Sequence, residues 1–337
     1  MKFINQYLII VLIILMCTAC SSSNKKWRTL EGSVWNTLFT VKYESEYNLE
    51  DSVYRMFECI DNSLSVFNRE SIVSLVNSSD SVEIDEHFNT VFETSKKISS
   101  YSHGRFDPTV GRLIDLWGFG KDKSENSKTL PDDEKIKKEL ENVGIINCRI
   151  EKGHLIKKNK LTTFNFSSLA KGYGCDLIGD MFKRNGVENY MIEIGGEINL
   201  KGHNIYGKEW VIQIDSPFFT DNDNFRSEPL LKIRTTDCAI ATSGNYRNNR
   251  ETSIGKLGHI IDPVTGYPSS NNMLSVTIIA ADAVTADAIA TACMLMNKEE
   301  AQKMVFEIGG ISALFVVETN EDGYDIIKTP HFPSTID

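Results

Sequence analysis

A carboxylate and a hydroxyl stand four residues apart in a run of small residues near the C-terminal end of the chain. Asp287 and Thr291 lie in the run 285–292, where four positions are alanine. Helical spacing places the two side chains on one face. Thr285 is the expected N-cap, which puts Asp287 in the first turn and leaves the first amide groups facing outward. Such a helix start could bind a hard cation together with the phosphate groups that the cation carries. An amphipathic helix with ordinary capping has the same sequence pattern.

The elements that must position these groups are strands and helices mixed in no regular order. Expected strands cover 34–43, 147–165 as a hairpin, 190–200 with a break at Gly195–Gly196, 210–215, 230–234, 239–242, 274–280 and 313–318. Expected helices follow Asn48, Asp85 and Leu169 and cover 113–117, 131–142 and 298–308, with Asp107 as a further N-cap and 71–77 as a loop. Without βαβ alternation, an α+β fold with mixed, largely antiparallel sheets and packed helices is favoured.

The composition narrows the class of ligand. The chain has 337 residues, 41% of them hydrophobic, and a formal net charge of −10. A nucleic-acid-binding protein normally carries a basic face, and no Lys/Arg run here is long enough to form one, so we expect no nucleic-acid partner. A phosphate-bearing ligand would therefore need local help from a metal ion or from helix ends.

The N-terminus has the pattern of a lipoprotein signal. Lys2 precedes an apolar run at 7–16, and small residues lead to Cys20 and a serine-rich stretch. The apolar run is too short for a comfortable membrane span and matches a signal-peptide core. We expect a signal peptide at 1–19, lipidation of Cys20, a tether at 20–30 and one domain at 31–337. The protein would then be exported, anchored to a membrane by lipid and facing the periplasm. The alternative is a short uncleaved anchor.

Seven segments together resemble the ApbE-like flavin transferases, the FAD:protein FMN transferases long labelled thiamine-biosynthesis lipoproteins. The segments are 106–111 (FDPTVG), 116–120 (LWGFG), 169–173 (LAKGY), 194–198 (IGGEI), 242–247 (TSGNYR), 259–268 (HIIDPVTGYP) and 285–291 (TADAIAT). They occur in the family's order and span nearly the whole chain after residue 30. Any one of them alone would be a weak signal, but the ordered set is a strong one.

The resemblance implies a flavin-binding α+β fold that uses Mg²⁺ and takes FAD as its substrate. The implied reaction moves the FMN half of FAD onto a threonine hydroxyl of another exported protein and releases AMP. Known acceptors in the family are flavin-bearing subunits of membrane redox complexes. Carried over by position, the metal ligands would be the side chains of Asp287 and Thr291 and the backbone carbonyl of Ser168. The FAD contacts would be Trp35, Phe67, Arg105, Phe106, Asp107, Asn165, Lys171 and Ile261.

Three positions depart from the family pattern. The family's Met-Gly-Thr near the first strand is Trp35-Asn36-Thr37 here, which changes the wall expected beside the flavin. Its usual aspartate before the Ala-Lys-Gly segment is Asn165, which removes a negative charge near the nucleotide. The glycine pair that follows is Ser167-Ser168, a change that a carbonyl ligand tolerates.

Two residues compete for the role of the base that deprotonates the acceptor threonine. His259 is favoured because imidazole changes protonation near physiological pH. The alternative is a structural histidine at the end of a strand that pairs with a neighbouring acidic side chain. Asp262 is the competitor, although Asp-Pro-Val-Thr-Gly is also an ordinary turn sequence. Two other functions use the same residues. One is a metal-dependent FAD pyrophosphatase that forms FMN and AMP, and the other is a membrane-tethered FAD carrier without turnover.

Overall fold

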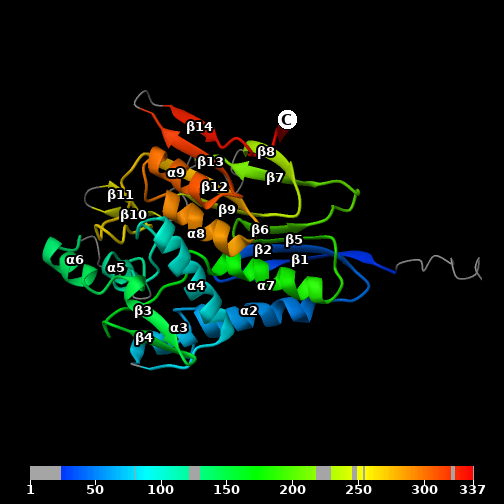
Figure 1. Ribbon diagram of the computed structural model, residues 1–337. Helices are drawn as coiled ribbons and strands as arrows, with labels where there is room; N and C mark the ends of the chain where they lie inside the picture. Colours follow the sequence, from blue (N-terminus) through cyan, green and yellow to red (C-terminus); the bar gives the residue numbers. More distant parts are fainter. Residues whose placement is uncertain are drawn as a thin grey trace, which may run out of the picture.

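One antiparallel sheet of eight strands runs through the structure, a computed structural model that describes residues 24–79, 81–120, 130–217, 229–244, 249–252, 255–319 and 323–336 (Figure 1). From one edge to the other its strands are β1 (Lys26–Val34), β2 (Thr37–Ser45), β5 (Tyr190–Ile194), β6 (Glu197–Lys201), β9 (Ala239–Gly244), β12 (Met273–Ala280), β13 (Ser312–Glu318) and β14 (Tyr324–Lys328). Every neighbouring pair is antiparallel. The expected α+β class with antiparallel sheet is confirmed.

Helices cover one face of this sheet. The helices of the described residues are α2 (Glu50–Leu64), α3 (Ile72–Ser78), α4 (Glu86–Tyr101), α5 (Gly111–Leu116), α6 (Asp133–Leu140), the 3-10 turn η1 (Ile145–Asn147), α7 (Ala170–Arg184), α8 (Ala283–Cys293) and α9 (Lys298–Ile308). Figure 1 shows α2, α4, α7 and α8 gathered on the same side of the strands. No helix in the described ranges has both the length and the apolar character that a membrane crossing requires.

The opposite face of the sheet carries a second, smaller sheet. It is formed by β7 (Trp210–Asp215), β8 (Pro229–Thr235) and β15 (Thr335–Ile336), in the order β15-β8-β7. Side chains alternate between the two faces along each strand. Ile240 of β9 therefore packs toward the small sheet, while its neighbours Ala239 and Ala241 pack toward the helices. On β6 the same alternation turns Glu197 and Asn199 away from the cluster that holds Ile198 and toward α7.

Two hairpins and a loop complete the end of the molecule near α5 and α6 in Figure 1. The hairpins are β3 (Cys148–Glu151) with β4 (His154–Lys157), and β10 (Asn249–Thr252) with β11 (Gly255–Gly258). The loop 259–272 joins β11 to β12 and packs through Ile261 against Leu113 and Trp117. This arrangement brings the candidate base segment beside the segment 105–117.

The first expected strand is in fact a hairpin. Residues 34–43 were predicted as one strand, but β1 ends at Val34 and β2 begins at Thr37. Trp35 and Asn36 form the turn, with φ of 48° and 60°, the conformation that a two-residue hairpin loop requires. The strand also begins at Lys26, so part of the predicted tether 20–30 belongs to the fold.

Two other local predictions in this half of the chain were wrong. Residues 71–77 form α3 rather than a loop, because the Ser71 hydroxyl accepts a hydrogen bond from the Ser74 amide and caps the helix. Asp107 is not an N-cap, since α5 begins at Gly111. Its carboxylate instead accepts hydrogen bonds from Thr109 and from the Ile145 amide of η1. Cys20, with the predicted signal peptide, lies outside the described residues.

Candidate active site

A glycine sets the contact between the two helices that carry the predicted metal and nucleotide residues. A Cβ atom on Gly172 of α7 would lie 2.3 Å from the carbonyl oxygen of Ala283 and 3.0 Å from Cβ of Asp287. No side chain fits at those distances, so only glycine allows α7 and α8 to approach this closely. The contact places Lys171 of α7 beside Asp287 of α8.

The amide groups at the start of α8 are all used inside the protein. Asp282 is the N-cap and accepts from the Thr285 amide at 2.9 Å, so Thr285 is not the cap and Asp287 lies in the second turn. Asp176 of α7 accepts from the amides of Ala283 and Val284, both at 2.8 Å. These donors already have carboxylate partners, and the Ala286 amide, which was expected to face outward after Thr285, bonds to the Asp282 carbonyl within the helix.

Asp176 makes the stability of this junction depend on pH. Burial raises its pKa from the ordinary value of 3.8 to about 7, although the amides of Ala283 and Val284 act to lower it. The folded state therefore keeps a proton that the unfolded chain releases. The stability that this carboxyl contributes is fully present below pH 3.8 and is lost as the pH rises through about 7.

The Asp176→Asn variant should flatten the fall in the free energy of unfolding over this pH window, by at most roughly 4 kcal/mol. An asparagine does not titrate, but its amide group faces one of the α8 N–H groups, so the variant is also less stable at low pH. Urea denaturation at several pH values measures both effects. Replacing the exposed Asp180 of the same helix by asparagine is the control, and an equal pH slope in wild type and Asp176→Asn would contradict the assignment.

One ammonium lies between two buried carboxylates. Lys171 Nζ is 3.2 Å from Glu197 Oε1 and 3.7 Å from Asp287 Oδ2. The Gly172 amide also donates to Asp287 Oδ2, at 3.2 Å. Burial acts to lower the pKa of Lys171, but the charges of Asp287 and Glu197 outweigh it and raise that pKa. Burial raises the pKa of both carboxyls, against the lowering effect of the ammonium.

The other two predicted metal residues are Thr291 and Ser168. Thr291, one turn beyond Asp287 on α8, has its hydroxyl 3.2 Å from the Ser243 hydroxyl of β9. Ser168 is half-buried in the turn that leads into α7. No group of three or more His, Cys, Asp or Glu side chains able to hold a metal occurs among the described residues. The predicted ligand set differs from such a group, because it combines one carboxylate, one hydroxyl and one backbone carbonyl. All three are oxygen ligands, which Mg²⁺ prefers.

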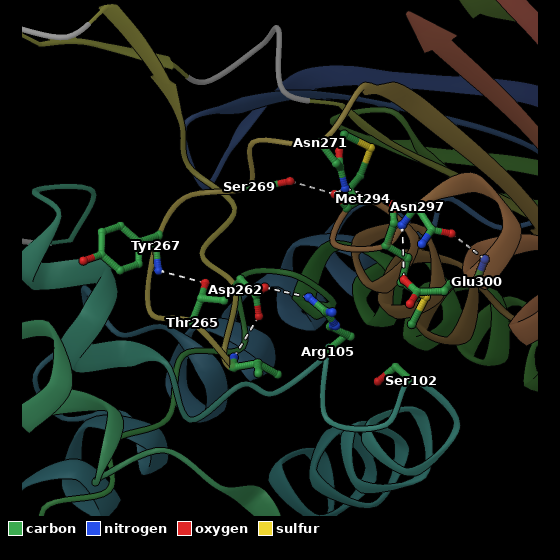
Figure 2. A network of polar contacts seen from close by, with 12 residues as sticks. Ser102, Arg105, Asp262, Thr265, Tyr267, Ser269, Asn271, Met294, Asn297 and Glu300 are labelled. Atoms are coloured by element: carbon green, nitrogen blue, oxygen red, sulfur yellow. Dashed lines mark hydrogen bonds and ion pairs between the residues drawn. The ribbon is translucent and has the colours of Figure 1, made fainter.

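Arg105 and Asp262 form a second charged pair, drawn near the centre of Figure 2. Arg105 Nη1 lies 2.7 Å from Asp262 Oδ2, and the Val264 amide donates to Oδ1 at 2.8 Å. Trp117 donates from Nε1 to the Gly266 carbonyl at 2.7 Å and holds the far end of the same turn. Both carboxylate oxygens of Asp262 are therefore engaged in fixing the loop, which makes this residue a poor candidate for a base.

Comparison with known proteins decides the family. A profile described as the ApbE family matches residues 35–315. A protein named FAD:protein FMN transferase from Vibrio cholerae is 33% identical over 329 residues, which cover 95% of this chain and 96% of the relative. Another of that name, from Haemophilus influenzae, is 29% identical over 335 residues, covering 95% and 94%. This chain belongs to the ApbE family.

Solved ApbE structures have the same fold. The flavin transferase ApbE from Vibrio cholerae aligns with a TM-score of 0.79 and 32% identity, over 91% of this chain and 98% of that one. The apo flavinyl transferase ApbE from Pseudomonas stutzeri aligns with a TM-score of 0.80 and 27% identity, over 91% and 95%. Similarity over nearly the full length of each chain means that the helices and strands around Asp287 belong to the shared fold.

The remaining residues carried over from the ApbE family occupy different kinds of position. Phe106 and Ile261 are buried in apolar clusters. Trp35 packs edge-on against Phe57 at the tip of the first hairpin, while Phe67 is exposed to 64% in the loop after α2. Asn165 accepts a hydrogen bond from the Ser167 amide and His259 lies half-buried at the end of β11. Their contacts with FAD stay predictions.

Two residues of this ApbE-family site were missed by sequence reasoning. Glu197 lay inside the segment IGGEI, where the glycine pair drew attention to the backbone rather than to the acid. Asp176 lay in a helix predicted only from its apolar positions. The available signal was an acid on the face of a strand or helix that is otherwise apolar, because such an acid has to find a buried partner.

Proposed function

We propose that this protein is an Mg²⁺-dependent FAD:protein FMN transferase that modifies a threonine of an exported acceptor protein. The observation that carries the proposal is full-length similarity to relatives of that name, with the predicted Lys171 and Asp287 meeting in one buried cluster. In the proposed reaction the threonine Oγ bonds to the phosphorus of the FMN half. The pyrophosphate P–O bond breaks, AMP leaves with the bridging oxygen, and the hydroxyl proton passes to a base.

Asp287, Thr291 and the Ser168 carbonyl would hold the magnesium ion. A bound Mg²⁺ would neutralise the charge that develops on the phosphate oxygens during this type of transfer. These residues fit a magnesium ion for two reasons: all three ligands are oxygen atoms, and Oδ1 of Asp287 has no partner among the described residues. Both contacts of the Asp287 carboxylate go to Oδ2, and no hydrogen bond or ion pair from a described residue reaches Oδ1.

Two of the proposed FAD contacts, Lys171 and Arg105, belong to the two charged groups described above. Lys171 keeps an ammonium beside the metal residues, where it can meet a phosphate oxygen. Arg105 is held by Asp262 and keeps part of its side chain exposed, at 33%, so the same guanidinium can also face a ligand. Trp35, Phe67 and the segment 105–107 would bound the site, with Asn165 and Ile261 near its nucleotide side.

His259 is the base that we propose, because Asp262 is already committed to Arg105 and to the Val264 amide. The His259→Gln variant should bind FAD with unchanged affinity while the rate of threonine labelling falls by about 10²–10⁴, the usual contribution of a positioned base. FAD binding followed by flavin fluorescence and labelling followed on gels separate the two effects. If Asp262 were the base, Asp262→Asn would abolish labelling without altering FAD affinity.

The function itself is tested by mixing protein, FAD and Mg²⁺ with a threonine-bearing subunit of a membrane redox complex. We expect a covalent fluorescent flavin on that subunit and one AMP for each flavin attached. Free FMN and AMP without labelled acceptor would identify a pyrophosphatase instead. Bound FAD without AMP formation over hours would identify a carrier. A chelator in a parallel reaction should stop labelling if the metal is required.

We also propose that Cys20 is lipidated and anchors the protein to a membrane on the periplasmic side. The support is the apolar run and small residues before Cys20. Expression of the full chain with Cys20→Ala should shift the protein from the membrane fraction to the soluble or unprocessed fraction. Equal membrane recovery of wild type and variant, with unchanged mass at the N-terminus, would contradict lipidation.

A further inference from the structure

The Lys171 ammonium occupies a shared position between two carboxylates that differ in their other contacts. Asp287 is held on one oxygen by the Gly172 amide, at 3.2 Å. Glu197 binds the ammonium through Oε1 at 3.2 Å, while its Oε2 is buried and has no hydrogen-bond partner among the described residues. An unsatisfied carboxylate oxygen in a buried position is costly unless another cation or donor can reach it.

The position of the Lys171 side chain allows its ammonium group to move between Asp287 and Glu197. Its side chain lies along the β5–β6 turn, where a Cβ atom on Gly195 would be 3.3 Å from Cδ of Lys171. The turn therefore holds the aliphatic stem, while the flexible end of the chain carries the ammonium. A shift from Asp287 toward Glu197 needs only rotation near that end, since Glu197 already lies 0.5 Å closer to Nζ (3.2 Å against 3.7 Å).

We infer that Lys171 is a stand-in cation for Asp287 and that Glu197 is the positioning residue that receives Lys171 when a divalent cation binds. This inference rests on the metal site of the proposed function. Without a metal, the ammonium balances the buried Asp287 carboxylate, which would be strongly destabilising if left unpaired. With a metal on Asp287, the ammonium is repelled and the second oxygen of Glu197 accepts it. Glu197 thus keeps a positive charge near the metal without letting it compete for Asp287.

The test is direct binding of Mn²⁺ alone, measured by electron paramagnetic resonance without FAD or acceptor. Lys171→Met should raise the Mn²⁺ affinity about tenfold, because a charged hydrogen-bonding competitor is removed. Glu197→Gln should lower the affinity several-fold, because Lys171 then has Asp287 as its remaining carboxylate partner. Lys171→Arg keeps the charge and should stay near wild type. Lys183→Met removes an exposed lysine from the same helix and should change nothing.

A double-mutant cycle separates a relay through Lys171 from simple charge attraction. In the Lys171→Met background, Glu197→Gln should lower Mn²⁺ affinity less than it does in wild type, since no ammonium remains to be positioned. Equal effects in both backgrounds, or an unchanged affinity in Lys171→Met, would overturn the inference. Thermal melting of each variant verifies that it is folded.

The Asp287→Asn variant distinguishes failure of the inference from failure of the metal site. If it abolishes Mn²⁺ binding while Lys171→Met has no effect, the metal site stands and only the stand-in role is lost. If Asp287→Asn leaves binding unchanged, or wild type binds no Mn²⁺, the metal ligands of the proposed function are wrong and the inference falls with them. None of these readings uses transferase activity.

Discussion

FMN transfer by the Asp287→Asn variant should fall by more than the roughly 10–100-fold that loss of an outer-shell partner of a metal typically costs. The asparagine keeps the shape of the side chain but removes the charge that would bind the metal and that now pairs with Lys171. Its carbonyl oxygen can still accept from the Gly172 N–H group, which at present donates to Oδ2. AMP release from FAD and covalent flavin on the acceptor are the measurements.

A matched control keeps this prediction specific. Asp180→Asn alters an exposed aspartate on α7 whose ion pair with Lys183 spans three residues, and surface pairs of this kind contribute little. We expect wild-type rates from it. A folded Asp287→Asn protein, verified by circular dichroism, that transfers FMN within about threefold of wild type would remove Asp287 from the metal site; that limit is about half of the 1.4 kcal/mol that a tenfold change represents.

The Gly172→Ala variant should lose both stability and activity. The added Cβ would meet the backbone carbonyl of Ala283, with its oxygen at 2.3 Å and its carbon at 2.7 Å, so one helix has to move. Overpacking of this kind costs about 1–3 kcal/mol. The same movement displaces Asp287 relative to Lys171, and a shift of about 1 Å in a catalytic site can cost roughly a hundredfold in rate.

Gly179→Ala is the control for helix propensity, because Gly179 lies in the same helix. There the added Cβ first meets the Tyr190 hydroxyl at 3.0 Å, which is the end of a side chain and not backbone. Alanine gains up to about 1 kcal/mol of helix propensity over glycine, which offsets the tighter contact. Urea denaturation and AMP release compare the two variants. If Gly172→Ala were as stable and active as Gly179→Ala, the close approach of α7 and α8 would not be needed.

Local patterns in the sequence were sufficient for much of the fold and for part of the site. Alternation and helical spacing predicted the α+β class, a hairpin within 147–165 that the structure contains as β3–β4, and the helix α9. The ordered motifs indicated the family. The spacing of Asp287 and Thr291 placed both on one face of α8, because a residue four positions along a helix returns to the same side.

Local patterns failed where a partner comes from another element. The cap of α8 was misplaced, since Asp282 and Thr285 are both good N-cap residues and only the backbone path between β12 and α8 selects Asp282. The first two amides of α8, those of Ala283 and Val284, are occupied by Asp176, which lies more than 100 residues earlier in the chain. Asp262, a candidate base by type, is instead engaged by Arg105.

The sequence by itself thus determined the family, the class of fold and the identity of the oxygen-bearing residues near the C-terminal end. Only the tertiary structure decided which of them are available for chemistry. It paired Lys171 with Asp287 and Glu197 because α7, α8 and the β5–β6 turn converge at Gly172 and Gly195. The physical reason is that burial makes a charged group depend on its nearest partner, and that partner is chosen by packing between elements distant in sequence.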